Sequence, residues 1–233
     1  MDTPVAIVTA AGRGVGAACA RALARRKYAV VLMSPSGTAT QLARELGGLG
    51  LQGSVAEPAD LDRLVRSTLE RYGRIDAVVN NTGHPPKGDL LEITDEEWRA
   101  GLDLLFLNVV RLTRLVTPVM LKQGSGTWVN ISSTAAVEPS LDFPVSSAFR
   151  AALGNYMRLY CLRYSANGIR MNTVLPGYFD SYPVNDAQLA GIPLRRVGTV
   201  DEVAEAVAFL LSAEAGYITG QSLRIDGGMT RVL

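Results

Sequence analysis

The chain alternates between short apolar runs and longer segments in which hydrophobic residues recur at helical spacing. Runs rich in β-branched residues, which favour strands, occupy residues 5–9, 29–33, 51–55, 77–80, 128–132, 169–175 and 222–226. Helical patterns lie at 16–27, 59–73, 95–123 and 200–213. Consecutive apolar positions, as in AVVLM at 29–33, indicate strands that are covered on both faces.

This alternation predicts the α/β class, with a Rossmann-type doubly wound parallel sheet of about seven strands and helices on both faces. Two helices begin with capping-box signals, Thr94 with Glu97 and Thr199 with Glu202. Because the sequence has no repeat, low-complexity segment or dividing linker, we expect one domain over residues 1–233. Ligands of such sheets bind at the carboxyl ends of the strands.

Composition narrows the possible partners. A chain of 233 residues, 48% of them hydrophobic, closes one large core. The net charge is +1, from 23 Lys and Arg against 22 Asp and Glu, and no basic run occurs, which argues against a nucleic-acid partner. No uninterrupted apolar run approaches ~20 residues and the N-terminus has no leader pattern, so we expect a cytoplasmic protein without a membrane partner. Cys19 and Cys161 lack disulfide or zinc spacing, and no metal is expected.

The first predicted strand is followed by a turn crowded with glycines: Gly12, Gly14 and Gly16. Without a Cβ, the backbone can come close to a diphosphate, and free N–H groups at a helix start can bind it. A tight turn that needs small residues would have the same composition. The position between an apolar strand and an amphipathic helix favours the phosphate-binding interpretation.

Several further segments occur in a recognisable order, and with them the chain resembles the short-chain dehydrogenase/reductase family. Residues 9–16 resemble its TGxxxGxG loop, with Ala10 in place of the first glycine, residues 80–83 its NNAG, and residues 129–133 the strand that carries its active-site serine. Residues 168–172 and 217–228 resemble signatures of the 3-oxoacyl-carrier-protein reductase-like branch. The resemblance implies that a nicotinamide cofactor is bound by Thr9, Gly12, Arg13, Gly14, Val15, Gly16, Ser34, Asn80, Asn81, Gly83, Arg150, Pro176, Gly177 and Ser181.

The choice of nicotinamide cofactor can be argued from charge. An acidic residue at the end of the second strand would bind the adenosine ribose and repel a 2′-phosphate, but Ser34 stands there. Arg13 can pair with such a phosphate, although it could equally be a solvated loop charge. NADP(H) is therefore favoured over NAD(H). Ser54 stands where the family often places an aspartate beside the adenine.

The resemblance also implies a catalytic set, which this chain carries only in part. Ser133 matches the serine that holds the carbonyl oxygen, and Asn108 matches the asparagine that anchors a relay water. By the family's spacing, Ser146 stands in place of the proton-donating tyrosine and Arg150 in place of its lysine. An alkyl hydroxyl is a far poorer acid than a phenol, and arginine does not cycle a proton. Loss of a general acid commonly costs a factor of ~10² to 10⁴, so a slow or redirected reaction is expected.

Other side chains could supply the proton. The candidates are His84, Asp142, Tyr178 and Tyr182. Each has a plainer interpretation: His84 as a residue at the pocket rim, Asp142 as a turn residue, and the two tyrosines as packing residues of a short substrate lid around 178–194. Tyrosines at 156, 160 and 164 share one helical stripe that we interpret as packing. In the family this helix contributes to subunit contacts, which implies a homotetramer or homodimer.

Three functions remain open from the sequence. The first is an NADP(H)-dependent oxidoreductase that reduces a small carbonyl or imine-like substrate by hydride transfer with a non-standard proton donor. The second is a cofactor-binding pseudoenzyme or regulatory subunit, favoured by the changed contacts. The third is a non-redox enzyme of the halohydrin dehalogenase kind, which has arginine at the lysine position but retains the tyrosine and lacks the glycine loop.

Overall fold

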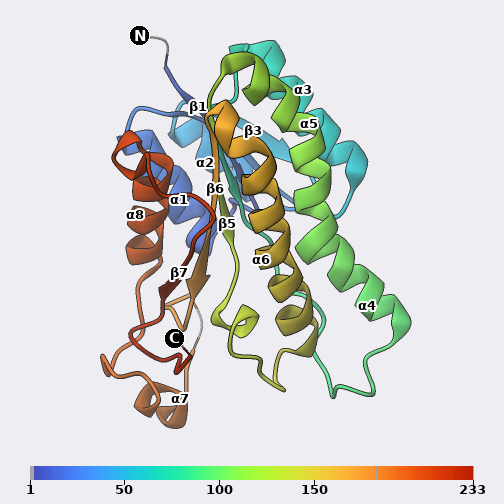
Figure 1. Ribbon diagram of the computed structural model, residues 1–233, viewed down its shortest axis with the longest axis vertical. Coiled ribbons are helices and arrows are strands. Elements are labelled where there is room, and N and C mark those ends of the chain that lie inside the picture. The colour runs from blue at the N-terminus through green and yellow to red at the C-terminus, as the bar shows by residue number, and fades with distance from the viewer. Residues whose placement is uncertain (1–2, 182, 233) are drawn as a thin grey trace.

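The computed structural model describes residues 3–181 and 183–232, and its centre is a seven-stranded parallel sheet (Figure 1). The strand order is β3-β2-β1-β4-β5-β6-β7, so the winding reverses between β1 and β4. The predicted α/β class and doubly wound sheet are confirmed. The strands are β1 (Val5–Thr9), β2 (Ala29–Ser34), β3 (Leu49–Gln52), β4 (Ala77–Asn80), β5 (Gly126–Ile131), β6 (Ile169–Pro176) and β7 (Ser222–Ile225).

Helices cover both faces of the sheet, with α1 and α8 on one side and α5 and α6 on the other (Figure 1). Their bounds are α1 (Gly14–Arg25), α2 (Thr38–Glu45), α3 (Pro58–Tyr72), α4 (Asp95–Leu102), α5 (Asn108–Gln123), α6 (Pro144–Tyr164), α7 (Asp186–Ala190) and α8 (Val200–Leu211). Neighbouring residues of one strand enter opposite cores: Val8 packs toward α1 and α8, whereas Ile7 packs toward α3 and α5. This alternation explains the continuously apolar strand runs.

The structure differs from the predicted elements at one strand, inside one long helix and at two short helices. Strand β3 forms at 49–52 instead of the predicted 51–55, because the Gly53 N–H donates to the Ser34 carbonyl at 2.9 Å and the chain then turns toward α3. The predicted helix over 95–123 contains a π-helical turn, Asp103–Leu107, between α4 and α5. The short helices α2 and α7 were not predicted; α2 has eight residues and exposes much of its polar side.

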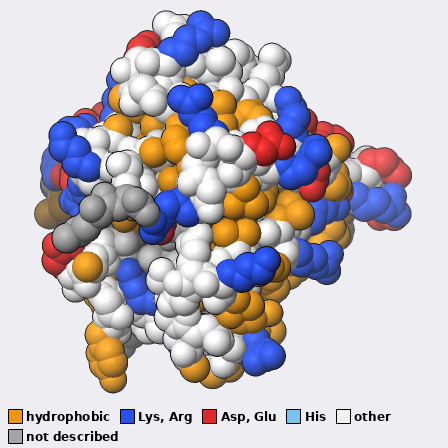
Figure 2. Space-filling model, turned by 90° about the horizontal axis from the view of Figure 1, so that it is seen from above, with side chains coloured by type: hydrophobic (Ala, Val, Ile, Leu, Met, Phe, Trp, Pro, Cys, Tyr) orange, Lys and Arg blue, Asp and Glu red, His pale blue; other side chains and the backbone are white. Residues whose placement is uncertain are grey.

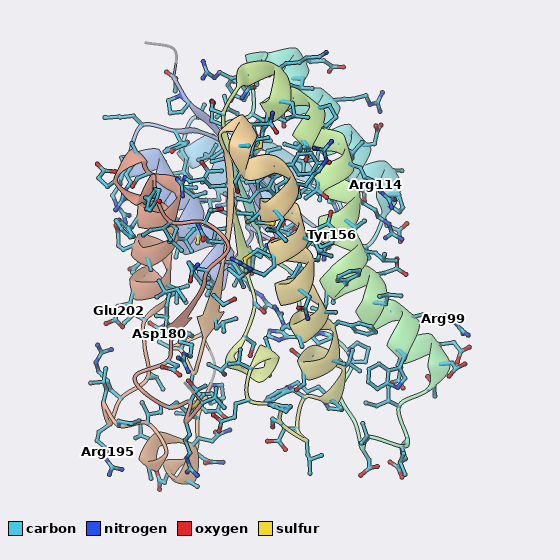
Figure 3. The ribbon with its side chains drawn as sticks, in the orientation of Figure 1. Arg99, Arg114, Tyr156, Asp180, Arg195 and Glu202 are labelled. Carbon is cyan, nitrogen blue, oxygen red and sulfur yellow. The ribbon has the colours of Figure 1, made fainter. Side chains whose placement is uncertain are left out.

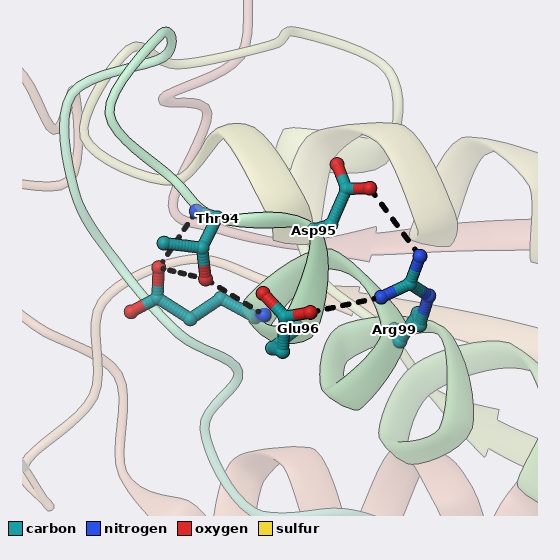
Figure 4. Close-up of polar contacts among 5 residues, drawn as sticks. Thr94, Asp95, Glu96 and Arg99 are labelled. Atoms are coloured by element: carbon teal, nitrogen blue, oxygen red, sulfur yellow. Dashed lines mark hydrogen bonds and ion pairs between the residues drawn. The ribbon is translucent and has the colours of Figure 1, made fainter.

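Both predicted capping boxes are present. At the start of α4, the Glu97 N–H donates to Thr94 Oγ1 at 3.2 Å and the Thr94 N–H donates to the Glu97 carboxylate at 2.9 Å (Figure 4). Arg99 adds ion pairs to Asp95 and Glu96 one turn back (Figure 4). At α8, Thr199 and Glu202 make the same reciprocal pair. These bonds satisfy N–H groups that a helix start leaves without partners.

The run from α4 to α5, Asp95–Gln123, is long and apolar enough to cross a membrane by length and composition alone, with a mean hydropathy of 1.6. Its apolar stripe, including Leu112 and Met120, lies in the core against the sheet. Arg111, in the middle of the run, pairs with Asp103 and donates to the Ala56 carbonyl of the segment before α3. Packing on the sheet therefore accounts for the hydropathy of this helix.

Charged side chains are dispersed over the face seen in Figure 2, where lysines and arginines are separated by acidic, polar and hydrophobic groups. Many of the charges are paired on the surface, as in Arg25 and Arg26 with Glu205. Such exposed pairs contribute little to stability, about 0–1 kcal/mol each.

Candidate functional site

Two loops that leave neighbouring strands are tied together at the carboxyl edge of the sheet. Thr9, at the end of β1, donates its hydroxyl to the Asn81 carbonyl at 2.7 Å and accepts the Asn81 N–H at 2.9 Å. The Asn81 amide also donates to the Ala10 carbonyl at 3.2 Å. The glycine loop, residues 9–16, and the 80–83 loop therefore form one unit at the point where the winding reverses.

Close approach of the backbone makes glycine necessary in this loop. A Cβ on Gly16 would lie 2.5 Å from the Ala10 carbonyl oxygen and 2.8 Å from the Asn81 amide nitrogen. Gly14 has a φ of +55°, in the left-handed region that favours glycine. It faces Ser181, whose Cβ would be 3.9 Å from an added Cβ. The segment after β6 thus closes over the start of α1.

Ala10 departs from the usual chemistry of such a turn. Its φ is +46°, a conformation that costs an alanine roughly 1–2 kcal/mol. Because the Ala10 carbonyl accepts the Asn81 amide, the loop holds this strained residue in place. Sequence reasoning noted the missing glycine at this position but did not predict that the left-handed backbone would persist.

The end of β2 presents hydroxyl groups and no carboxylate of its own. The buried Ser34 donates to the Ser36 carbonyl at 2.8 Å and accepts the Ala39 N–H at 3.3 Å. The Ser36 and Thr38 hydroxyls are 2.7 Å apart. Arg13 is exposed and, among the described residues, has no ion-pair partner. A Cβ on Gly12, the residue before Arg13, would meet the hydroxyls of Thr38 and Ser34, so the glycine loop lies beside the start of α2.

Asp60, in the first turn of α3, is a carboxylate that sequence reasoning missed near this edge. It accepts the Ser54 N–H at 2.9 Å and pairs with Arg63 at 2.5 Å. The backbone bond from Ser54 and the bond from Arg63 lower the pKa of this carboxyl. Asp60 is therefore ionised, and its carboxylate holds the loop around Ser54 in place.

At the other half of the edge, Ser146 and Arg150 lie one turn apart at the start of α6. The Arg150 Nε donates to Ser146 Oγ at 3.0 Å, and its Nη1 donates to the carbonyl of Ile131, the last residue of β5, at 2.8 Å. Burial lowers the pKa of Arg150 to about 10, so the guanidinium stays charged at pH 7. Arg150 thus joins α6 to the strand that precedes Ser133.

The side chains of Ser133 and Asn108 both hydrogen-bond to backbone groups close to them in the sequence. Ser133 caps a 3₁₀ turn, accepting the Ala135 N–H at 3.2 Å. Asn108 begins α5 directly after the π-helical turn and donates to the Leu104 carbonyl. Its Oδ1 is buried and has no partner among the described residues. A buried acceptor of this kind is usually satisfied by water or a ligand group.

The 80–83 loop leads into a strongly basic rim. Burial and the charges of Lys87, Arg150 and Arg13, in that order, lower the pKa of His84. Lys87 Nζ lies 4.7 Å from the centre of the Phe143 ring, just before α6. Asp142 is exposed on the turn beside it, where its N–H donates to Ser140 Oγ at 3.2 Å. The structure therefore brings His84 near Arg150, and it adds Lys87, which sequence reasoning missed.

The segment after β6 is anchored at both ends. The Gly177 N–H donates to the Ile225 carbonyl at 3.0 Å, and Phe179 forms a bridge with Gly198. Tyr178 accepts the Gln188 amide from α7 at 3.2 Å. Asp180 caps α8 by accepting the Val200 N–H at 3.1 Å, and Figure 3 shows it near Glu202 at the start of that helix. Tyr182 lies outside the described residues.

The tyrosine stripe of α6 packs against α5, as predicted. The Tyr156 and Tyr160 hydroxyls lie 2.7 and 2.8 Å from the hydroxyls of Thr113 and Thr117. Figure 3 shows Tyr156 between the two helices, while Arg99 and Arg114 point outward. On the other side of α6, a cavity of about 350 Å³ is bordered by Arg150, Arg158 and Ser222 of β7. Within the part of the chain that the structure describes, no three His, Cys, Asp or Glu side chains gather as a metal site would need.

The sheet order, the interlocked glycine loop and the polar loops after β4 and β5 are those of a Rossmann-type doubly wound fold. The family model for enoyl-(acyl carrier protein) reductase matches residues 9–230. The chain belongs to the short-chain dehydrogenase/reductase family.

Several relatives with similar sequences are reductases that match over nearly their whole length. The chain is 35% identical to the 3-oxoacyl-[acyl-carrier-protein] reductase of Synechocystis, over 98% of both chains. It is 33% identical to the corresponding reductase of Escherichia coli, again over 98% of both. The crystal structure of YwfH, an NADPH dependent reductase involved in bacilysin biosynthesis, superposes with a TM-score of 0.94 over the whole of both chains. At 24% identity, that likeness supports the fold.

Proposed function

We propose that the protein is an NADP(H)-dependent oxidoreductase that reduces a small carbonyl or imine-like substrate by hydride transfer. The observation that carries the proposal is the interlocked loop of Thr9, Gly16 and Asn81, because a glycine turn at a helix start lets backbone N–H groups come close to a diphosphate. The reductase relatives support the same reaction class and do not favour a pseudoenzyme or a dehalogenase.

The residues of this chain fit the cofactor at three places. The glycine loop and the start of α1 would bind the diphosphate. Arg13, with the hydroxyls of Ser34 and Thr38, would bind a 2′-phosphate, since no carboxylate at the end of β2 repels it. Val15, Asn80, Gly83, Pro176, Gly177 and Ser181 complete the proposed cofactor site. The bound nicotinamide would supply the hydride.

The catalytic proposal differs from the usual pattern of the family. Ser133 would orient the substrate oxygen or nitrogen, and Asn108 would hold a water through its unpaired Oδ1. Ser146 stands in the tyrosine's place and is held by Arg150, so neither side chain is a good proton donor. The proton would come from water, or the substrate would arrive already protonated, as an iminium does.

His84 is a weak candidate for the donor at neutral pH. Burial and three cations lower its pKa below the ordinary 6.5, so the ring is neutral above that pH. We propose that His84 belongs to the rim, that Asp142 is a turn residue, and that residues 178–194 form a short lid. The single domain, the cytoplasmic location and a homotetramer or homodimer stay predictions; gel filtration with light scattering measures the last.

Titration with NADPH and NADH, followed by reduced-nicotinamide fluorescence, tests the proposal. We expect NADPH to bind more tightly than NADH. Arg13→Ala should weaken NADPH binding by about tenfold and leave NADH binding unchanged, because the loss of a charged contact of about 1.4 kcal/mol lowers the affinity tenfold. Arg21→Ala is the matched control, because Arg21 is an exposed arginine of α1 that pairs with Glu45. No binding of either cofactor at millimolar concentration would refute the proposal.

A further inference from the structure

Arg150 is a charged side chain whose surroundings do not neutralise it. Its two hydrogen bonds go to a hydroxyl, on Ser146, and to a backbone carbonyl, on Ile131. Among the described residues, no carboxylate lies within ion-pair distance of it. Burial alone lowers its pKa, to about 10, with no opposing contribution from an acidic neighbour. A partly buried charge without an opposite charge is unfavourable unless a ligand provides one.

The charges that act on this rim are mostly positive, and within the described part of the chain Asp142, on the exposed turn beside Phe143, makes no ion pair with Lys87 or Arg150. Lys87 reaches the Phe143 ring at 4.7 Å, directly before α6, and no described carboxylate pairs with it. The charges of Lys87, Arg150 and Arg13 all act on His84. Arg13 lies at the glycine loop, where cofactor phosphates would neutralise it. Lys87 and Arg150 remain uncompensated at the end where the substrate would bind.

The family's usual pair would not leave this imbalance. A lysine beside a tyrosine stabilises the phenolate, so the pair can hold one negative charge. Ser146 is neutral at any working pH, and an arginine does not lose its proton. The ribose of a cofactor offers only neutral hydroxyls to Arg150. The missing negative charge must therefore come from the substrate.

We propose that the substrate carries a carboxylate, which Arg150 binds and Lys87 attracts; this inference rests on the proposed function. A guanidinium has five N–H donors, of which Arg150 uses two. The three that remain, one on Nη1 and two on Nη2, can donate charge-assisted hydrogen bonds to a carboxylate. The same charges disfavour a bare iminium cation. An imine substrate would therefore be an imino acid, whose carboxylate offsets its own positive charge.

Paired probes that differ only in the acid group test this inference. The pairs are 4-oxopentanoate with its methyl ester, and 1-pyrroline-2-carboxylate with 1-pyrroline. Binding is measured by the shift in melting temperature with and without NADPH, and turnover by NADPH oxidation. We expect each acid to bind at least tenfold more tightly than its neutral partner, and its kcat/KM to be at least tenfold higher.

Variants separate charge from structure. Arg150→Met should abolish the preference for the acid, whereas Arg150→Lys should keep most of it. Lys87→Met should reduce the preference by about threefold. Because Lys87 is exposed, this variant tests the effect of charge even if the Arg150 variant misfolds. Lys122→Met, an exposed lysine at the far end of α5, should leave it unchanged. Equal binding of acid and neutral partner by the unaltered protein would overturn the inference, even if NADPH binds normally. Failure of NADPH to bind would instead refute the proposed reductase.

Discussion

The two halves of the carboxyl edge differ in how their side chains are satisfied. At the nucleotide half, the loops after β1 and β4 bond to each other through Thr9 and Asn81, and Asp60 fixes the next loop. At the catalytic half, Arg150 keeps an unbalanced charge and Asn108 keeps an unpaired buried oxygen. The loops of the first half bond to each other and leave Arg13 and the buried Asn80 Oδ1 without partners among the described residues, whereas the second half leaves a buried charge and a buried acceptor. In the proposed function, this difference would separate binding of the dinucleotide from the chemistry at the substrate.

The largest effect is expected from breaking the nucleotide half. Gly16→Ala places a methyl group 2.5 Å from the Ala10 carbonyl and 2.8 Å from the Asn81 amide, so the interlocked loops must move apart. We expect NADPH affinity to fall at least about 100-fold, or roughly 3 kcal/mol, measured by fluorescence titration.

The matched control is Gly154→Ala in α6, where an added methyl group meets nothing within 4 Å. It should bind NADPH normally. If Gly16→Ala also binds NADPH normally, the interlocked loop is not the cofactor site.

The second effect tests the catalytic half. The double variant Ser146→Tyr, Arg150→Lys restores a tunable acid and its partner, and we expect ketone turnover to rise at least about tenfold, since a general acid is worth ~10² to 10⁴. The assay is NADPH oxidation with a ketone panel at saturating cofactor. The single variant Arg150→Lys is the control, because it restores the lysine without adding the phenol. If the double variant turns over ketones no faster than this control, the substrate pocket and not proton transfer limits turnover.

His84 should matter less than either region. Because its pKa lies below 6.5, the ring is neutral at pH 7.5 and we expect His84→Ala to change turnover less than about threefold there. A role as acid would show as a rate that increases when the pH falls through that lowered pKa, since only then is the imidazolium present. A 100-fold loss at pH 7.5 would identify His84 as the donor after all.

The smallest effect concerns backbone strain at the nucleotide half. Ala10→Gly relieves a φ of +46° but adds freedom to the unfolded chain. We expect a net gain of about 0.5 kcal/mol and an increase of roughly 1–2 °C in melting temperature, with NADPH affinity within twofold. Ala24→Gly, in the last turn of α1, should instead lower the melting temperature. A decrease for Ala10→Gly would show that the position is not strained.

The fold could be predicted from the sequence because its signals are local. Apolar strand runs, the helical spacing between them and the capping pairs at Thr94 and Thr199 each depend on a few neighbouring residues. The π-helical turn before Asn108 and the earlier start of β3 depend on contacts between segments, so neighbouring residues gave no signal for them.

The site was predictable where it follows a motif. The glycine loop was singled out from its glycines and Asn81 from the resemblance of residues 80–83 to a family motif, and the structure adds that the two loops bond to each other. Lys87 was missed because its position over Phe143 joins residues 56 positions apart by sequence number. An exposed lysine in a proline-rich loop has no pattern that distinguishes it from a solvated charge.

The bond between Thr9 and Asn81 has a consequence for how this protein can be altered. Because each loop supplies a partner that the other needs, neither is a separable module, and a glycine loop transplanted from another reductase would work only if its threonine met an equivalent asparagine. Grafts that exchange residues 9–16 alone should lose dinucleotide affinity, whereas grafts that exchange 9–16 together with 80–83 should keep it. We therefore expect dinucleotide affinity to follow the pair of loops and not either loop alone.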